Sequence, residues 1–425
     1  MKGEQIAVIG GGPAGLAAAL AASEEGAKEI IIMERDGEPG GILNQCIHDG
    51  FGNIIFGESL TGPEYVERNV ELLLRRPGVR VLTGTMVLHI GPDRLLKAVN
   101  REKAFELKPA AVILAMGCRE RSRFQVTLPG YRPAGIYTAG AVQRLINMEG
   151  LMPGERAVIL GSGDIGLIMA RRLTLEGAQV CGVFEILPRP GGLTRNIVQC
   201  LQDFEIPLFL SHTVTFIHGQ KRLSGVSVAP VDSLGKPCLE QERFIPCDTL
   251  ILSVGLIPEN ELSRGASVLI DETTGGPRVD QNMATSVEGI FAGGNVVHVH
   301  DLVDHVSRAA AVAGKAAARF AAGRRYGPER LLLLPGENVA SLVPQQLSLP
   351  LLEKEQIDLY IRVSSQIRGA AVTLLHRGDP FYHKKMRMVS PTEMIHLELA
   401  PSFFKGLDNG EEILCRVAAE EVRGE

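Results

Sequence analysis

Two stretches of the chain repeat the same order of hydrophobic and polar positions. Each begins with a short apolar segment, at residues 6–9 and 157–160, and continues through a glycine-rich turn into a helical stretch rich in alanine or leucine. Each then reaches a second apolar segment that ends in an acid, at residues 30–34 and 180–185. This order predicts a βαβ unit in both stretches, and hence two parallel sheets with helices on their faces.

Beyond these two units the pattern predicts more strands and one long helix. Residues 223–228, 249–254 and 290–295 favour strands, and the alanine-rich residues 302–322 favour a helix. A domain boundary is expected at residues 323–335. The chain after it consists of short strand-like runs separated by turn residues: 357–363, 370–375, 385–389, 394–399 and 412–418. This last part is therefore predicted to be a small all-β module of the sandwich type.

Length and composition indicate an ordinary globular protein of several domains. A chain of 425 residues is too long for one compact core. Forty-four basic and 49 acidic residues give a net charge of −5, which does not favour nucleic acid or an anionic membrane as a partner. The N-terminus lacks a signal-peptide layout, and no clean apolar run of about 18 residues occurs. We therefore expect a soluble, cytoplasmic protein with no transmembrane segment.

The cysteines argue against several kinds of site. There are seven, at positions 46, 118, 181, 200, 238, 247 and 415. None forms a Cys-x-x-Cys or Cys-x-x-x-x-Cys pair, so a zinc knuckle, an iron–sulfur ligand set and a disulfide framework are all poorly supported. Free thiols at this frequency fit a reducing compartment.

The first glycine turn has the spacing of a dinucleotide-binding site. Gly10, Gly12 and Gly15 form a G-x-G-x-x-G, in which the glycines allow a tight turn, close approach of a pyrophosphate and close packing of helix on strand. The helix N-terminus then offers N–H groups and the positive end of its dipole to the phosphates. Glu34, 24 residues beyond Gly10, can accept hydrogen bonds from a ribose. These features together predict dinucleotide binding rather than a structural turn.

The second turn repeats the device with Gly161, Gly163 and Gly166, and Glu185 lies 24 residues beyond Gly161. An acid at this place repels a 2′-phosphate, so NAD(H) is favoured over NADP(H). Arg189 and Arg195 lie near enough in sequence to leave NADP(H) open as the alternative.

Two such folds, one inserted in the other, resemble the flavoprotein reductases of the pyridine nucleotide-disulfide oxidoreductase type, such as thioredoxin reductase, glutathione reductase and NADH oxidase. Gly40 and Gly41 resemble the glycine pair that passes the flavin. Residues 113–121 resemble the family's crossing between domains, with Met116 in place of its threonine. Residues 249–258 resemble the strand that returns the chain, and residues 289–295 the strand that holds the ribityl chain of FAD, with asparagine in place of the usual aspartate.

Residues 40–52, 138–147 and 295–307 bear a closer resemblance to the FAD/NAD subunits of dye-linked opine, sarcosine and glycerol 3-phosphate dehydrogenases. The resemblance covers residues 1 to about 322 and implies a discontinuous FAD-binding domain (1–121 and 246–325) and an NAD-binding domain (122–245). The strand pattern beyond it predicts a C-terminal β domain (335–425), which we expect to be a subunit interface. The cofactor-binding residues it implies, together with the two turns, are Gly10, Gly12, Pro13, Ala14, Gly15, Glu34, Arg35, Gly41, Ile42, Ala115, Gly117, Gly161, Gly163, Asp164, Ile165, Gly166, Glu185, Gly255, Gly294, Asn295 and Asp304.

The chain lacks the cysteine pair that a disulfide reductase uses to take electrons from a flavin. Only Cys46 lies near the expected flavin segment, and His48 follows it. Cys46 is a candidate redox thiol and His48 a candidate proton donor. The alternative interpretation is a buried, inert thiol and a histidine that only forms hydrogen bonds.

Two other segments contain clusters of polar or charged side chains. Residues 298–305 hold three histidines and two aspartates, which are potential metal ligands. In the family that the chain resembles, this stretch precedes the helix that points at the flavin, which implies a role at the flavin or a partner interface instead. Helix capping by Asp301 or Asp304 is the alternative, and no metal is predicted. The basic residues 383–387 are interpreted as a solvated strand face.

These patterns predict an oxidoreductase that passes hydride or electrons between NAD(H) and a second redox partner through bound FAD. The missing disulfide and the added β module indicate that this partner is another protein chain, within an oligomeric dehydrogenase complex. One alternative is a stand-alone NADH oxidase or peroxidase that uses Cys46. A third hypothesis, from another class, is a dinucleotide-sensing assembly subunit without turnover.

Overall fold

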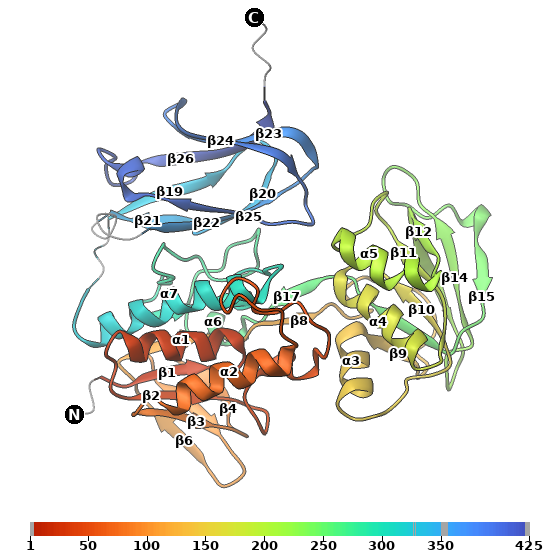
Figure 1. Ribbon diagram of the computed structural model, residues 1–425, viewed down its shortest axis with the longest axis horizontal. Helices are drawn as coiled ribbons and strands as arrows, with labels where there is room; N and C mark the ends of the chain where they lie inside the picture. The colour runs from red at the N-terminus through yellow and green to blue at the C-terminus, as the bar shows by residue number, and fades with distance from the viewer. Residues whose placement is uncertain (1–3, 326, 328, 350–355, 421–425) are drawn as a thin grey trace, which may run out of the picture. The chain divides into compact units, whose positions relative to one another are not determined.

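The computed structural model of the protein describes residues 4–325, 327, 329–349 and 356–420. The chain divides into two compact units (Figure 1). The first contains Met1–Cys118 and Pro258–Glu425, and the second contains Arg119–Ile257. The short strands β8 (Cys118–Glu120) and β17 (Leu256–Pro258) carry the chain across the division and pair with each other.

A five-stranded parallel sheet forms the centre of the first unit, in the order β18-β7-β1-β2-β3. All four residues of β1, β2 and β7 are buried, as expected for strands covered on both faces. The strands are β1 (Ile6–Ile9), β2 (Ile30–Met33), β3 (Val79–Leu82), β7 (Ala111–Leu114) and β18 (Ile290–Ala292).

Helices and a small antiparallel sheet accompany this central sheet. Helices α1 and α7 pack closely, and a Cβ added at Gly314 of α7 would lie 2.1 Å from the carbonyl oxygen of Ala18 in α1. The helical segments are α1 (Pro13–Glu24), η1 (Gly41–Gln45), α2 (Gly62–Leu74), α6 (Glu261–Gly265), η4 (Gly294–Val296) and α7 (Val303–Ala321). The small sheet contains β4 (Met86–Ile90), β5 (Leu96–Val99) and β6 (Ala104–Leu107).

The second unit repeats the parallel plan in the order β12-β11-β10-β16-β9. Its strands are β9 (Ile136–Thr138), β10 (Arg156–Leu160), β11 (Gln179–Glu185), β12 (Leu208–Leu210) and β16 (Thr249–Leu252). Its helical segments are α3 (Ala139–Asn147), α4 (Asp164–Leu175), α5 (Thr194–Cys200), η2 (Gln202–Phe204) and η3 (Leu239–Gln241). An antiparallel sheet adds β13 (His212–His218), β14 (Gly225–Pro230) and β15 (Arg243–Ile245).

The described C-terminal part of the first unit, from residue 329 onward, is mostly β-structure and includes the short 3-10 helix η6 (Pro401–Phe404). One sheet has the order β21-β19-β26-β23-β24 and the other β20-β22-β25. Apolar side chains of both sheets form one core. The strands are β19 (Arg330–Pro335), β20 (Val339–Val343), β21 (Gln346–Ser348), β22 (Ile357–Val363), β23 (Ile367–His376), β24 (Asp379–Val389), β25 (Ile395–Leu399) and β26 (Glu412–Ala419).

The β module packs on the rest of the first unit through polar contacts as well as apolar ones. The backbone N–H of Val279 donates to Oε1 of Gln345 at 3.0 Å, and Nε2 of Gln281 donates to the carbonyl of Ser348 at 2.8 Å. Arg362 of β22 pairs with Asp301 at 2.7 Å. These contacts hold the module against residues 279–281 and against the segment that leads into α7.

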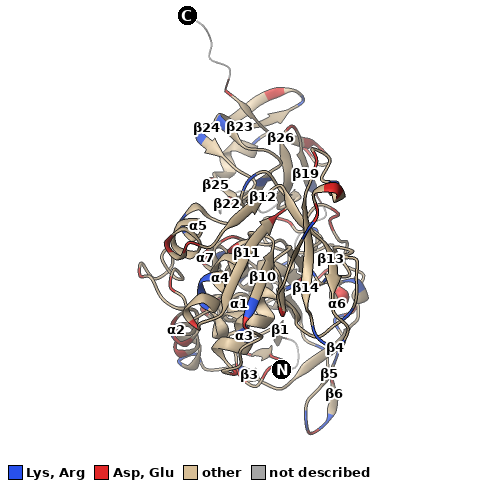
Figure 2. Ribbon diagram, turned by 90° about the vertical axis from the view of Figure 1, so that its right-hand side faces the viewer, with Lys and Arg blue, Asp and Glu red and all other residues tan. Residues whose placement is uncertain are grey.

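The predicted architecture of two nested Rossmann-like folds and a C-terminal all-β domain is confirmed. The pattern did not reveal β19, β20 and β21, and β19 lies inside the stretch that was expected to be only a boundary. No helix in the described ranges is long and apolar enough to cross a membrane. Basic and acidic residues are interspersed along the chain (Figure 2).

Candidate functional site

The first glycine turn joins β1 to α1. The N–H of Gly10 donates to the carbonyl of Met33 at 2.9 Å, and its φ of +103° is one that glycine adopts most readily. A Cβ at Gly10 would lie 2.5 Å from the carbonyl oxygen of Ala115, and a Cβ at Gly15 only 1.9 Å from that of Gly10. At Gly12 the only described neighbour of such a Cβ within 4.0 Å is Gly41. The turn is thus packed on its strand side and open at Gly12, the residue before α1.

Glu34 at the end of β2 is bonded to this turn. Its Oε2 accepts the N–H of Gly11 at 2.7 Å, and its Oε1 accepts the N–H of Asp36 at 2.8 Å. The carboxylate is buried. Since a carboxylate offers about four acceptor positions, two remain for a ligand. Of the neighbouring candidates, Pro13 and Ala14 begin α1, and Arg35 is exposed.

The segment from Gly40 to His48 runs beside the turn. Gly40 donates its N–H to the carbonyl of Gly11 at 2.8 Å, and Ile42 is 53% exposed. Cys46 is 8% exposed, and its Sγ donates to the carbonyl of Ile42 at 3.3 Å. His48 is half-buried, and its Nδ1 lies 3.1 Å from the carbonyl oxygen of Asp49. The two candidate catalytic residues thus follow the contact with the turn in the chain and differ in burial.

Two later segments of the first unit also approach the turn. A Cβ at Gly294 would lie 2.7 Å from Cβ of Ala14. Asn295 donates from Nδ2 to Sγ of Cys118 at 3.7 Å, and its Oδ1 accepts the N–H of His300 at 3.0 Å. Gly117, which accepts a backbone bond from Glu259 at 3.0 Å, lies at the same end of β7 as Ala115. The predicted residues of these segments thus follow the carboxyl ends of β1, β7 and β18, and Glu34 follows that of β2.

The long helix α7 is not capped by an aspartate. Leu302 is the N-cap residue and makes no side-chain capping bond. Asp304 is buried and accepts the N–H of Ile55 at 3.0 Å, while Asp301 pairs with Arg362. The capping role considered for these two aspartates is wrong, because tertiary contacts take up both carboxylates.

The second glycine turn joins β10 to α4 in the second unit. Gly161 has a φ of +93° and donates its N–H to the carbonyl of Phe184 at 2.7 Å, and a Cβ there would lie 2.1 Å from the carbonyl oxygen of Ser253. Gly163 precedes α4, Asp164 and Ile165 are its first residues, and Gly166 donates its N–H to Oγ of Ser253 at 3.1 Å. Gly255, in the same unit, accepts the N–H of Arg121 at 2.9 Å.

Glu185 at the end of β11 is bonded to the second turn. Its Oε2 accepts the N–H of Ser162 at 2.9 Å and the hydroxyl of Ser162 at 2.6 Å. Its Oε1 accepts the N–H of Leu187 at 3.0 Å. Both Glu185 and Ser162 are buried. The acid is in the place that the sequence predicts, already held by three donors.

A cluster of aromatic and charged side chains joins α7 to the β module. The rings of His298 and His300 lie 4.0 Å apart between centroids, and Tyr360 of β22 lies 5.4 Å and 5.1 Å from them. Burial lowers the pKa of His298 to about 3, aided by Arg362 and His305, and it lowers the pKa of His300 well below its usual value. Both imidazoles are therefore neutral near pH 7.

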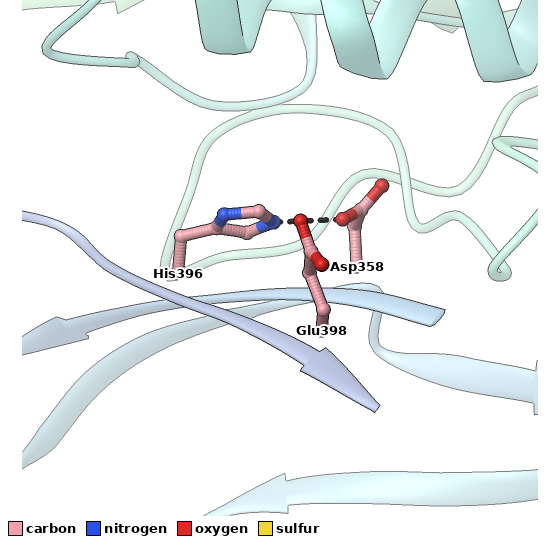
Figure 3. A group of neighbouring side chains, drawn as sticks. All are labelled: Asp358, His396 and Glu398. Carbon is pink, nitrogen blue, oxygen red and sulfur yellow. Dashed lines mark hydrogen bonds and ion pairs between the residues drawn. The ribbon is translucent and has the colours of Figure 1, made fainter. Parts of the chain in front are cut away.

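The same cluster contains a group with ligand-like side chains, Asp358, His396 and Glu398 (Figure 3). Nε2 of His396 lies 2.7 Å from Oδ1 of Asp358. The guanidinium of Arg308 in α7 lies 3.0 Å from Asp358 and 2.6 Å from Glu398. Because an arginine cation already bonds both carboxylates, the group is an ionic contact between α7 and the module.

Sequence reasoning found the histidines of residues 298–305 but not their partners in β22 and β25. Those partners are more than 50 positions away, and nothing local in the sequence marks them. It also missed Ser162, whose only signal is a hydroxyl at a position where the first turn has Gly11. The basic residues 383–387 lie on β24, an edge strand, and most are exposed.

Two glycine turns on two parallel sheets, each bonded to an acid at the end of the next strand, are typical of a protein with two dinucleotide-binding folds. The sequence profile of the pyridine nucleotide-disulphide oxidoreductase family matches residues 4–317. The chain belongs to this family of FAD-dependent NAD(P)H oxidoreductases.

Individual relatives agree with this assignment. The chain is similar to hydrogen cyanide synthase subunit HcnB of Pseudomonas protegens, with 29% identity over 60% of this chain and 57% of the relative. It is similar to one of the opine oxidase subunits of Agrobacterium tumefaciens, with 25% identity over 74% of this chain and 64% of the relative. The chain thus spans about three fifths of the length of these relatives. Among solved structures, thioredoxin reductase of Lactococcus lactis has a TM-score of 0.60 at 22% identity, covering 76% of this chain and all of that one.

Proposed function

We propose that this protein is an FAD-dependent oxidoreductase that exchanges hydride with NAD(H) and electrons with a second protein subunit. The observation that carries the proposal is the matched pair of glycine turns, each with a glycine before a helix and a buried acid bonded to the turn. Among the described residues, a Cβ at Gly12 would meet only Gly41, at 4.0 Å, and one at Gly163 would lie 3.2 Å from Oγ of Ser253. The first turn suits FAD, which stays bound, and the second turn suits NAD(H), which exchanges. The proposed FAD-binding residues lie in the first unit and the proposed NAD-binding residues in the second.

The residues of the first turn fit the pyrophosphate and ribose of FAD. Gly12 leaves open the approach to the N-terminus of α1, where the helix dipole and the first N–H groups favour a diphosphate. Glu34 keeps two acceptor positions for ribose hydroxyls. Bound FAD would supply hydride and single-electron chemistry. Asn295, bonded to Cys118 and to the backbone of His300, would keep its amide fixed beside the ribityl chain.

The second turn fits NAD(H) better than NADP(H). Glu185 is buried and points at the turn, so a 2′-phosphate would meet a carboxylate in a region with little water. Arg189 is half-buried and Arg195 is exposed. Within the described residues, neither the Arg189 side chain nor the Arg195 side chain makes a hydrogen bond or ion pair that would hold it toward a phosphate. We therefore propose NAD(H) as the exchangeable dinucleotide.

The acceptor is proposed to be another protein rather than a dithiol on this chain. All seven cysteines lie within the described residues, and no disulfide joins any two of them. Cys46 donates a hydrogen bond from Sγ to the carbonyl of Ile42. The two relatives named above are both subunits of larger enzymes. The β module, with its long edge strand β24, is the proposed surface for such a partner. Because the sequence resembles the FAD/NAD subunits of opine, sarcosine and glycerol 3-phosphate dehydrogenases, we propose that this partner oxidises an amine, an opine or glycerol 3-phosphate.

Matched substitutions in the two turns test the proposal. Gly12→Val and Gly163→Val each place an isopropyl group before a helix in equivalent positions. We expect Gly12→Val to be purified without FAD. We expect Gly163→Val to retain FAD in normal amount but to lose reduction by NADH. Reduction of the Gly163→Val flavin at the normal NADH concentration would contradict the proposed division of the two sites. Rapid reduction of artificial dyes by the wild type would support an electron-transferring subunit over a sensor.

A further inference from the structure

The two turns correspond position by position. Each residue of the second lies 151 positions beyond its counterpart, as Gly161 lies beyond Gly10 and Glu185 beyond Glu34. The correspondence extends past the acids to a Pro-Gly-Gly sequence, at residues 39–41 and 190–192. In both units the acid accepts the N–H of the residue after the first glycine and the N–H of the residue two positions beyond itself. Differences between the copies are therefore informative.

The Pro-Gly-Gly segments are anchored in different ways. In the first unit the N–H of Gly40 bonds to a backbone carbonyl, that of Gly11. In the second unit the N–H of Gly191 donates to the hydroxyl of Ser162 at 2.7 Å. The following residues are held by the side chain of Asp164, whose Oδ1 accepts the N–H of Leu193 at 2.8 Å. The second segment is therefore attached to its turn by side chains that the first unit lacks.

The hydroxyl of Ser162 is the centre of this arrangement. It donates to Oε2 of Glu185 at 2.6 Å and accepts from Gly191 at 2.7 Å, and the residue is fully buried. Its own N–H also bonds to Oε2. The Glu185 carboxylate has about four acceptor positions. Ser162 occupies both positions on Oε2, and the N–H of Leu187 occupies one of the two on Oε1. A single position, on Oε1, is left for a ribose hydroxyl.

We propose that Ser162 is a positioning residue for nucleotide selection: its hydroxyl fixes the rotation of Glu185 and the place of the 190–192 segment, so that Oε1 meets the 2′-hydroxyl of the adenosine ribose. This inference rests on the proposed binding of NAD(H) to the second unit. NADPH carries a phosphate in place of that hydroxyl and has no hydrogen to donate to Oε1. Orientation of Glu185 by Ser162 therefore increases the affinity for NADH and does not increase the affinity for NADPH.

The test is direct binding of NADH and NADPH to the FAD-loaded protein by anaerobic calorimetry. The flavin is reduced with dithionite beforehand, so that no hydride transfer contributes heat, and steady-state dye reduction is measured in parallel. The variants are Ser162→Ala and Ser162→Gly, the second of which copies the first turn. Thr174→Ala, which removes a hydroxyl bonded to the carbonyl of Ala170 on the same helix, is the matched control. Both Ser162 variants should weaken NADH binding about tenfold, or about 1.4 kcal/mol, and raise KM without lowering kcat. Binding of NADPH should change less than twofold, and FAD content should not change.

The outcomes separate this inference from the proposed function. Equal weakening of NADH and NADPH would mean that Ser162 has only a structural role, and it would overturn the inference. Unchanged binding of NADH would overturn it as well, while the proposed function would stand. Failure of the wild type to bind either dinucleotide would instead remove the proposed function, on which the inference rests. The Ser162→Gly variant, with no side chain to misplace, guards against a packing artefact of alanine.

Discussion

Replacement of His298 by leucine should make the contact between α7 and the β module less sensitive to acid. His298 is 5% exposed, and its ring faces His300, Tyr360, His305 and Arg362. Burial is the main cause of its lowered pKa, and the positive charge of Arg362 adds to it. A proton on this ring would enter a site that stabilises only the neutral form.

The magnitude follows from the difference in pKa between the folded and unfolded states. The folded pKa of about 3 lies below the ordinary value of 6.5, so the unfolded state binds the proton first as the pH falls. The neutral His298 ring makes its full contribution to the free energy of unfolding above pH 6.5, and this contribution is lost progressively between pH 6.5 and pH 3. At pH 5 the loss from His298 alone is about 2 kcal/mol. The lowered pKa of His300 acts in the same direction.

Hydrogen exchange on peptides of β22 (Ile357–Val363) measures this locally, since a chain of two units need not unfold in one step. Protection at pH 7.5 and pH 5.0, corrected for the intrinsic exchange rate, gives the change in opening free energy. The wild type should lose at least about 2 kcal/mol more than His298→Leu over this range. The exposed His89, replaced by glutamine, serves as the control and should behave as the wild type. An equal loss in wild type and His298→Leu would refute the reasoning.

Three further outcomes are expected. Arg308→Ala should lower the opening free energy of β22, measured by hydrogen exchange, by about 1 kcal/mol, because this half-exposed cation bonds Asp358 and Glu398. The control Lys315→Ala, on the exposed face of α7, should leave it unchanged. Gly314→Ala should lower the melting temperature of the first unit, at a cost of about 1–3 kcal/mol, because its Cβ would lie 2.1 Å from a carbonyl of α1. Cys46→Ser should leave NADH-driven reduction of FAD unchanged, and loss of peroxide or oxygen turnover in that variant would favour the oxidase alternative.

The nested fold could be predicted from the sequence because its signals are local. A strand, a glycine turn, a helix and an acid occur within about 30 positions in each unit, and the parallel sheets require just this order. The strand β19 escaped prediction because it pairs with β26, some 80 positions later. An apolar run with a distant partner does not differ locally from a boundary segment.

The side-chain contacts of the site were less accessible to sequence reasoning. Asp304 satisfies the sequence rule for a helix cap, yet its carboxylate accepts the N–H of Ile55, 249 positions earlier. The histidines before α7 were visible, but Tyr360 and His396 meet them only because the β module packs there. Ser162 could have been found by aligning the two turns with each other. The bonds it makes to Glu185 and Gly191 required the folded structure.

The most direct test of the central claim is the absorbance spectrum of the purified protein, recorded without oxygen before and after one equivalent of NADH. The account predicts a flavin spectrum before the addition and bleaching of the flavin band after it. A bound flavin that stays oxidised would contradict the proposed NAD(H) site of the second unit. A protein that binds no FAD under any condition would contradict the assignment of the first.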